Sequence, residues 1–227
     1  MDGRKRIALY GGTFDPVHVG HLEIARKLLQ LFALDELLFI PAYVAPHKRE
    51  SEVTPAWHRY ACLALATQNE DALCVSTIEL DAPERPYTFE TLTRLQIKLG
   101  FSARLFFVMG ADSWSEIDTW REWERVLSLT DQIVITRPGY ELSAAHVTPH
   151  IRAKLVDLRG ASEARVASEI DNRKTDEGTK IFVTDAVLND VSATAIRRAV
   201  RDGRSDEWER LVPPPVAEYI RKYRLYR

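Results

Sequence analysis

The chain has 227 residues, of which 45% are hydrophobic and 28% are charged. This length and composition suit one sizeable core, which favours a single α/β domain over residues 1–227. The 31 basic and 33 acidic residues give a net charge of −2, so overall charge favours neither nucleic acid nor a membrane surface as a partner. Too few apolar residues precede Gly11 for a signal peptide, and no apolar run reaches membrane-spanning length, so we expect a cytoplasmic protein.

Short β-rich runs alternate along the chain with longer runs of helical periodicity. The strand-like runs are mostly apolar on both faces, and they cover residues 6–10, 36–42, 73–80, 104–110, 132–136 and 180–184. The helical runs cover residues 22–33, 55–67, 88–100 and 122–129, with N-cap signals at Thr54–Pro55 and Thr88 and a C-cap signal at Gly100. The alternation predicts a doubly wound parallel sheet, with ligands beyond the carboxyl ends of its strands.

Two segments depart from this alternation. Residues 141–179 are polar and charge-rich and lack a sustained apolar face, so we expect a mobile or peripheral insertion. Residues 190–227 predict a small C-terminal helical part, with a proline stop at 213–215 and a last helix from Val216. That last helix is more typical of packing than of function.

The stretch "GGTFDPVHVGH", residues 11–21, lies where the first strand run gives way to the first helical run. Gly11 and Gly12 allow a tight turn and a close approach of the backbone to a ligand. Asp15–Pro16 fixes the exit from that turn. The pattern therefore predicts a loop that contacts a ligand closely.

The helix after this loop is predicted to begin near Val19 or Gly20. Its first N–H groups and the positive end of its dipole then face the loop, where a phosphate is favoured. His18 and His21 are three residues apart, so they lie toward one side of a helical turn and can donate to phosphate oxygens. This arrangement predicts stabilisation of charge during phosphoryl or nucleotidyl transfer.

The same stretch admits plainer explanations. A single histidine is more often structural, and two histidines at this spacing also suit a metal, although a structural zinc site needs further Cys or His partners nearby. Cys62 and Cys74 form no C-x-x-C pair, and we predict no protein metal site. The dinucleotide fingerprint G-x-G-x-x-G and the P-loop pattern G-x-x-x-x-G-K-[ST] are both missing from the sequence.

A second motif, "NDVSATAIRRAV", covers residues 189–200. Ser192 is a natural N-cap, Thr194 falls in the first helical turn, and Arg197 lies three residues later on the same face. Hydroxyls, backbone amides and a guanidinium at a helix start suit the outer phosphates of a triphosphate. Taken alone, an ordinary capped helix with a solvated Arg197 is the commoner explanation.

Together, the two motifs resemble the signature pair of the nucleotidyltransferase superfamily, and the chain is similar to bacterial nicotinate-nucleotide adenylyltransferases. The resemblance covers most of residues 6–140 and 180–225. It includes "APHK" (45–48), "PYTFETL" (86–92), "FVMGADSW" (107–114), "DTWREWERVL" (118–127) and "RPGY" (137–140). Ala193 replaces one serine of the family's I-S-S-T pattern, and the 141–179 segment looks longer than is typical.

The resemblance implies a Rossmann-like nucleotidyltransferase fold and a role in NAD biosynthesis. The 5′-phosphate of nicotinate mononucleotide would attack the α-phosphorus of ATP directly, giving nicotinate adenine dinucleotide and pyrophosphate without a covalent enzyme intermediate. Mg²⁺ would accompany ATP as the cofactor. The expected partners are these small molecules, with the oligomeric state, including a homo-oligomer, left open.

The resemblance also implies roles for individual residues. The catalytic residues would be His18, His21 and Arg197. The residues for ATP and its phosphates would be Gly11, Gly12, Thr13, Phe14, His47, Lys48, Gly110, Asp112, Arg137, Ser192 and Thr194. Thr88 and Trp120 would bind nicotinate mononucleotide, the indole stacking on the pyridine ring. Plainer roles stay open for several of these: a solvated loop for His47 and Lys48, a structural turn at Arg137 and Pro138–Gly139, and core packing for Trp120.

Four other functions share parts of this pattern. A pantetheine-phosphate adenylyltransferase or a cytidylyltransferase would have the two end motifs but should lack the "GADSW" to "DTW" segment. A class I aminoacyl-tRNA synthetase has a similar histidine loop, but 227 residues leave no room for its usual domains. A catalytically silent nucleotide-binding module would lose the phosphate-contacting side chains, which are all present here.

Overall fold

The computed structural model describes residues 3–43, 53–82, 84–137, 139, 141–171, 178–185 and 191–227. The chain divides into two compact units, each built from separate stretches of sequence. The first unit comprises Met1–Tyr10, Arg26–Leu37 and Pro86–Leu188, and the second comprises Gly11–Ala25, Leu38–Arg85 and Asn189–Arg227. The prediction of a single domain is not tested by this division and stays a prediction.

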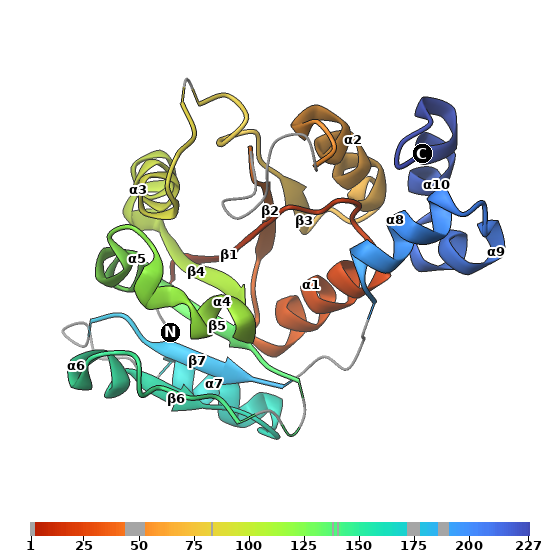
Figure 1. Cartoon of the computed structure of the whole chain (residues 1–227). Helices are drawn as coiled ribbons and strands as arrows, with labels where there is room; N and C mark the ends of the chain where they lie inside the picture. The colour runs from red at the N-terminus through yellow and green to blue at the C-terminus, as the bar shows by residue number, and fades with distance from the viewer. Residues whose placement is uncertain are drawn as a thin grey trace. The chain divides into compact units, whose positions relative to one another are not determined.

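Seven strands form one sheet in the order β3-β2-β1-β4-β5-β7-β6 (Figure 1). They are β1 (Lys5–Gly12), β2 (Glu36–Pro41), β3 (Leu73–Val75), β4 (Ala103–Gly110), β5 (Asp131–Ile135), β6 (Leu155–Asp157) and β7 (Ile181–Thr184). The order reverses between β1 and β4, which is typical of doubly wound sheets. The predicted α/β fold with a doubly wound parallel sheet is confirmed.

Ten helices and three 3₁₀ turns are present in the described part of the chain. The helices are α1 (Val19–Leu31), α2 (Ala56–Thr67), α3 (Thr88–Leu99), α4 (Ala111–Ser115), α5 (Trp123–Leu129), α6 (Pro149–Arg152), α7 (Glu163–Asp171), α8 (Ala193–Arg201), α9 (Ser205–Trp208) and α10 (Pro214–Tyr223). The 3₁₀ turns are η2 (Gly100–Ser102), η3 (Ile117–Thr119) and η4 (Glu209–Leu211). No described helix combines the length and the apolarity needed to cross a bilayer.

In the first unit, β1, β4, β5, β7 and β6 pair in parallel, with Ala8 beside Phe106 and Val108 beside Ile133. These side chains are buried, as their runs of apolar residues predict for strands covered on both faces. Helices α3 and α5 lie side by side (Figure 1), and the Gln96 amide donates to the Leu129 carbonyl at 2.7 Å.

The segment 141–179 is more ordered than its composition predicts. Its described part contains α6, β6 and α7, and β6 pairs with β7 at the edge of the sheet. Ile151, Val166 and Ile170 are buried. The interpretation that this segment lacks an apolar face is therefore wrong for α7, where Val166 and Ile170 lie four residues apart on one side. A three-residue strand and a four-residue helix are too short to give a periodic signal.

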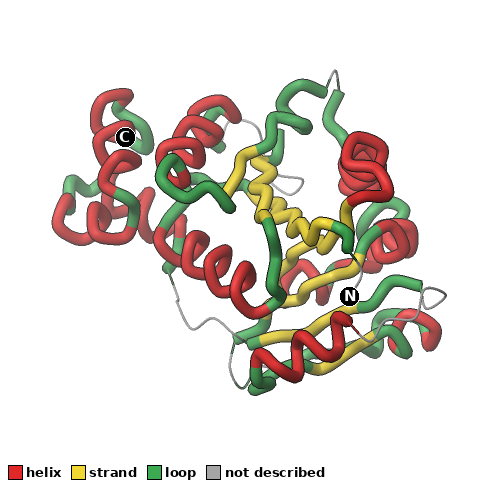
Figure 2. The backbone as a smooth tube through the Cα atoms, turned by 180° about the vertical axis from the view of Figure 1, so that it is seen from behind, coloured by secondary structure: helices red, strands yellow, loops and turns green. Residues whose placement is uncertain are grey.

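In the second unit, α2 and α10 lie side by side (Figure 2). His58 of α2 and the Tyr219 hydroxyl of α10 form a hydrogen bond of 2.9 Å. The last helix begins at Pro214, not at Val216, because prolines are well tolerated in a first helical turn, where the missing N–H has no helical partner. The predicted proline stop is therefore a helix start.

Two other predicted boundaries need correction. The strand expected over residues 73–80 contains only Leu73–Val75. The N-cap of α3 is Tyr87 and not Thr88, because Tyr87 has an extended backbone and donates its N–H to the Glu90 carboxylate at 2.7 Å. The predicted C-cap at Gly100 is confirmed by its φ of +65°, which glycine adopts readily.

Candidate active site

The loop between β1 and α1 is shaped by the ring of Phe14. A Cβ atom on Gly12 would lie only 2.9 Å from this ring, so the ring occupies the space that the glycine leaves. Phe14 has a φ of +50°, and its buried ring packs edge-on against His21 and Phe39, with centroids 5.0 and 5.4 Å away. Gly12 therefore makes room for a side chain of its own loop, a role that the sequence did not indicate.

Helix α1 begins at Val19, as predicted, and places His18 and His21 against each other. Their rings stack with centroids 3.7 Å apart and planes 26° apart. The backbone N–H of His18 donates to Nδ1 of His21 at 3.3 Å. Because Nδ1 is an acceptor, we infer that neutral His21 carries its proton on Nε2.

The glycine between the two histidines leaves room for the His18 ring. A Cβ on Gly20 would lie 3.2 Å from His18 Nδ1, closer than such contacts usually are, and 3.5 Å from Cβ of Val191. His18 Nδ1 is buried and has no hydrogen-bond partner among the described residues. An unsatisfied buried imidazole nitrogen is costly to a protein on its own and fits a group that acquires its partner from a ligand.

Both histidines are neutral near pH 7. Burial lowers the pKa of His18 to about 4. Burial also lowers the pKa of His21 well below 6.5, and the neighbouring charge of His18 lowers it further. An incoming phosphate would oppose both effects, because a negative charge favours the protonated imidazole.

The second motif reaches the first through Arg197. Ser192 caps α8 by accepting the N–H of Ala195, as predicted. The Arg197 guanidinium donates to the main-chain carbonyl of Asp15 at 2.7 Å and to the Thr194 hydroxyl at 3.1 Å. The structure therefore brings together two motifs separated by 182 positions and rules out a merely solvated Arg197.

Asp15 is the point where further segments converge. Its buried carboxylate accepts the Tyr226 hydroxyl at 2.9 Å and the N–H of Thr54 at 3.3 Å. The Tyr226 contact and the buried Arg59 of α2 were missed by the sequence analysis. Tyr226 lies in a basic stretch and Arg59 in an ordinary helical pattern, so neither carries a local signal.

The predicted residues of the first unit lie on β4, α3, α4 and the turns beside them. Gly110 ends β4, and Asp112 is exposed in the first turn of α4. Thr88 is the first residue of α3. Trp120 follows η3, and its half-buried ring meets Phe107 edge-on with centroids 6.4 Å apart.

The remaining predicted residues are only partly described. Arg137 is exposed after β5, and Gly139 has a φ of +76°, as the third residue of a type II turn requires. His47, Lys48 and Pro138 lie outside the described residues. Within the part of the chain that the structure describes, no group of three or more His, Cys, Asp or Glu side chains could hold a metal ion.

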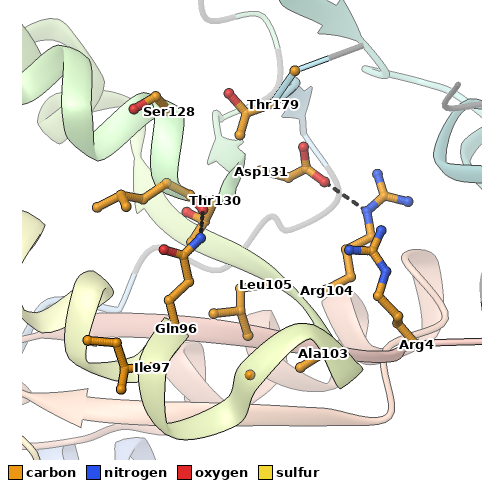
Figure 3. A pocket seen from close by; sticks show the side chains of 13 residues that line it. Arg4, Gln96, Ile97, Ala103, Arg104, Leu105, Ser128, Thr130, Asp131 and Thr179 are labelled. Carbon is orange, nitrogen blue, oxygen red and sulfur yellow. Dashed lines mark hydrogen bonds and ion pairs between the residues drawn. The ribbon is translucent and has the colours of Figure 1, made fainter. Parts of the chain in front are cut away.

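A cavity of about 580 Å³ lies in the first unit near the amino ends of β4 and β5, and none of the predicted site residues lines it (Figure 3). Arg104 there donates to the Asp131 carboxylate at 2.8 Å, and the Thr179 hydroxyl donates to the Leu127 carbonyl at 2.6 Å. The Arg104 Nε and the Thr179 hydroxyl are therefore engaged by groups of the protein itself.

The chain matches the family model described as cytidylyltransferase-like over residues 9–199. A curated protein of Desulfatibacillum aliphaticivorans named "Probable nicotinate-nucleotide adenylyltransferase" is 35% identical over 226 residues, covering 97% of this chain and 99% of that protein. A protein of the same name from Symbiobacterium thermophilum is 36% identical over 221 residues, covering 97% and 95%. The solved structure of Plasmodium falciparum nicotinic acid mononucleotide adenylyltransferase complexed with NaAD has a TM-score of 0.71 and 18% identity over 98% of each chain, a likeness of fold.

Proposed function

This chain belongs to the nicotinate-nucleotide adenylyltransferase family of cytidylyltransferase-like proteins, and we propose that it transfers the adenylyl group of ATP to nicotinate mononucleotide. The products are nicotinate adenine dinucleotide and pyrophosphate. The phosphate of the mononucleotide attacks the α-phosphorus of ATP in line, and pyrophosphate leaves with the electrons of the broken P–O bond. No covalent intermediate on the enzyme is involved.

The observation that carries this proposal is the contact between Arg197 and the carbonyl of Asp15. It holds the guanidinium of the second motif to the loop that precedes His18 and His21. Phosphoryl-type transfer requires mainly alignment and charge neutralisation from the protein. The two histidines, the start of α1 and Arg197 supply donors and positive potential for those tasks.

The histidines act as hydrogen-bond donors and not as a general base. In the absence of ligand both are neutral, and the Nε2–H of His21 is directed by the contact at Nδ1. A phosphate that gains negative charge in the transition state raises the proton affinity of the pair and strengthens these hydrogen bonds.

Mg²⁺ enters with ATP as part of the substrate complex. This ion keeps several of its waters and binds substrate phosphates, so it needs few protein ligands. That behaviour fits a chain whose described residues include no cluster of three or more metal-ligating side chains. When bound, Mg²⁺ neutralises phosphate charge.

Trp120 and the first turn of α3 recognise the nicotinate part of the substrate in this proposal. The indole supplies a flat face, and the N–H groups near Thr88 are donors for a carboxylate. The Glu90 carboxylate lies in the same turn but accepts the N–H of Tyr87 at 2.7 Å. This bond does not remove the negative charge of Glu90, so the donors near Thr88 have to outweigh its repulsion of a carboxylate ligand.

Pyrophosphate release tests the proposal. The purified chain is given ATP with Mg²⁺ and, in separate reactions, nicotinate mononucleotide, nicotinamide mononucleotide or phosphopantetheine. We expect release with nicotinate mononucleotide at the highest kcat/KM. Fastest release with phosphopantetheine, or with CTP in place of ATP, would assign the chain to a different nucleotidyl transfer. ATP binding without turnover of any acceptor would indicate a silent module.

A further inference from the structure

Arg59 of α2 is almost completely buried, with 1% of its surface exposed. In the described part of the chain its guanidinium donates four hydrogen bonds, all to main-chain carbonyls. The acceptors are Thr54 at 2.8 Å, Thr13 at 2.7 Å, Ala42 at 2.6 Å and Tyr43 at 3.0 Å. One side chain therefore joins the loop after β1, the segment after β2 and the residue before Pro55.

A buried guanidinium is expensive unless its donors are satisfied. Here burial lowers the pKa of Arg59, and the carboxylate of Asp15 raises it in part. The charge is thus balanced by carbonyl dipoles and by a carboxylate of the same loop that Arg197 contacts. Surface packing of α2 alone would not require a buried cation.

The bond to Thr13 fixes the orientation of one peptide group. In a trans peptide the C=O and the following N–H point in opposite directions. Because the Thr13 carbonyl points to Arg59, the N–H of Phe14 points away from Arg59. The loop that precedes the two histidines is thereby held in one orientation from the α2 side.

We propose that Arg59 is a positioning residue for nucleotide transfer, holding the Thr13–Phe14 peptide in the orientation that receives the ATP phosphates. This inference rests on the proposed function for its kinetic readout. In this proposal Arg59 acts through the loop, since its guanidinium donates to main-chain carbonyls. Lysine cannot replace it, because an ammonium group lacks the rigid planar fork that reaches three separate segments.

Arg59→Lys tests the proposal, with Arg104→Lys as the matched control. Arg104 is also a buried arginine, 5% exposed, and it donates to the Ile170 carbonyl and the Asp131 carboxylate at the amino end of β4. Both variants keep the positive charge of the side chain but replace the planar guanidinium by an ammonium group, so both should lower the Tm. Only R59K disturbs the loop before His18.

We expect R59K to lower kcat by about 10- to 100-fold per folded molecule, because small misplacements of aligned groups cost that much. R104K should keep kcat within about twofold of the unmodified chain. Binding of inorganic triphosphate with Mg²⁺, measured by calorimetry, should weaken by about tenfold in R59K and remain unchanged in R104K. Binding of nicotinate mononucleotide should change in neither.

Equal kinetic constants and equal triphosphate affinity in folded R59K and R104K would overturn the proposal. R59K is assayed at low temperature with trimethylamine N-oxide, which favours the compact state. If R59K does not fold even then, Arg59 is required for the fold, and the positioning role is rejected. The triphosphate measurement needs no turnover, so a failure of the proposed reaction is distinguishable from a failure of this inference.

Discussion

The ring of His18 lies flat against the ring of His21, and its own backbone N–H occupies Nδ1 of that partner. Two imidazolium ions at a centroid distance of 3.7 Å would repel each other strongly, so the pair carries at most one proton readily. The stack therefore gives the site two neutral donors whose proton affinity responds to an incoming anion.

Substitutions of His21 should distinguish its two nitrogens. His21→Ala, like His18→Ala, is expected to lower kcat by about 100-fold or more with the fold intact. His21→Gln places an amide near the Nε2 position and should retain more activity than His21→Asn, whose amide lies near Nδ1. Steady-state kcat for the three His21 variants checks this order, and a more active Asn variant would contradict the Nε2 assignment.

Gly20→Ala should displace the His18 ring, because the new methyl group would lie 3.2 Å from Nδ1. We expect kcat to fall by about tenfold or more with little change in Tm, since the ring shifts but α1 gains a better helix former. Gly178→Ala is the control, because a Cβ there meets no atom within 4 Å and that glycine lines the cavity of Figure 3, whose lining residues include neither histidine. Equal kcat in both variants would show that the ring position is unimportant.

The buried histidine makes stability depend on pH. The unfolded chain protonates His18 as the pH falls through 6.5, whereas the folded chain keeps it neutral until about pH 4. The titration of His18 should therefore lower the unfolding free energy progressively as the pH falls through this window, by about 3 kcal/mol once the whole window has been crossed. Above the window, His18 should make no contribution to the pH dependence of stability. Urea unfolding from pH 7 to 4.5 measures the slope, which His18→Gln should reduce. An unchanged slope would mean that His18 titrates normally.

Arg197→Ala should weaken ATP binding and slow turnover while leaving affinity for nicotinate mononucleotide largely unchanged, since its proposed target is the leaving pyrophosphate. Arg198→Ala is the control, because Arg198 is the exposed neighbour on the same helix. Calorimetric titration with each ligand separates the two affinities. Equal losses for both ligands in Arg197→Ala would assign this guanidinium to structure only.

Nicotinate mononucleotide should be preferred over nicotinamide mononucleotide by about 10- to 100-fold in kcat/KM. The amide N–H₂ of nicotinamide would face backbone donors and leave them unsatisfied, at about 1–3 kcal/mol per group. Trp120→Ala should weaken the use of both mononucleotides without inverting the preference, and Trp57→Ala, which removes a largely exposed indole, should affect neither. Comparable kcat/KM values for the two substrates would show that the pocket is wrongly assigned.

The sequence predicted those parts of the molecule whose signals are local. The apolar runs placed six of the strands, and the helix start at Val19 and the Ser192 cap followed from neighbouring residues. By contrast, β6 has only three residues inside a polar segment, and its pairing with β7 is a tertiary effect. Short strands of this kind are specified by their partners and leave no periodicity to detect.

The same division applies to the candidate site. His18, His21 and Arg197 were predicted from motifs, and the structure adds the contact that joins those motifs. Arg59 could not be predicted, because an arginine in an amphipathic helix is normally exposed and its acceptors are backbone atoms, which carry no sequence identity. The N-cap of α3 lies one residue before the Thr88 that N-cap preference favours, because the Glu90 carboxylate accepts the N–H of Tyr87.

The hydrogen bond between Tyr226 and Asp15 spans 211 positions, and the bond from Arg197 spans 182. During synthesis, a ribosome adds about 5–20 residues per second, so the loop after β1 exists for about ten seconds or more before Tyr226 is made. Contacts between residues so far apart in sequence also carry a larger entropy cost than the contacts within a helix, and they therefore form more slowly. The loop after β1 is therefore among the first segments to be translated, but its contacts with Arg197 and Tyr226 form only after the C-terminal residues have been made.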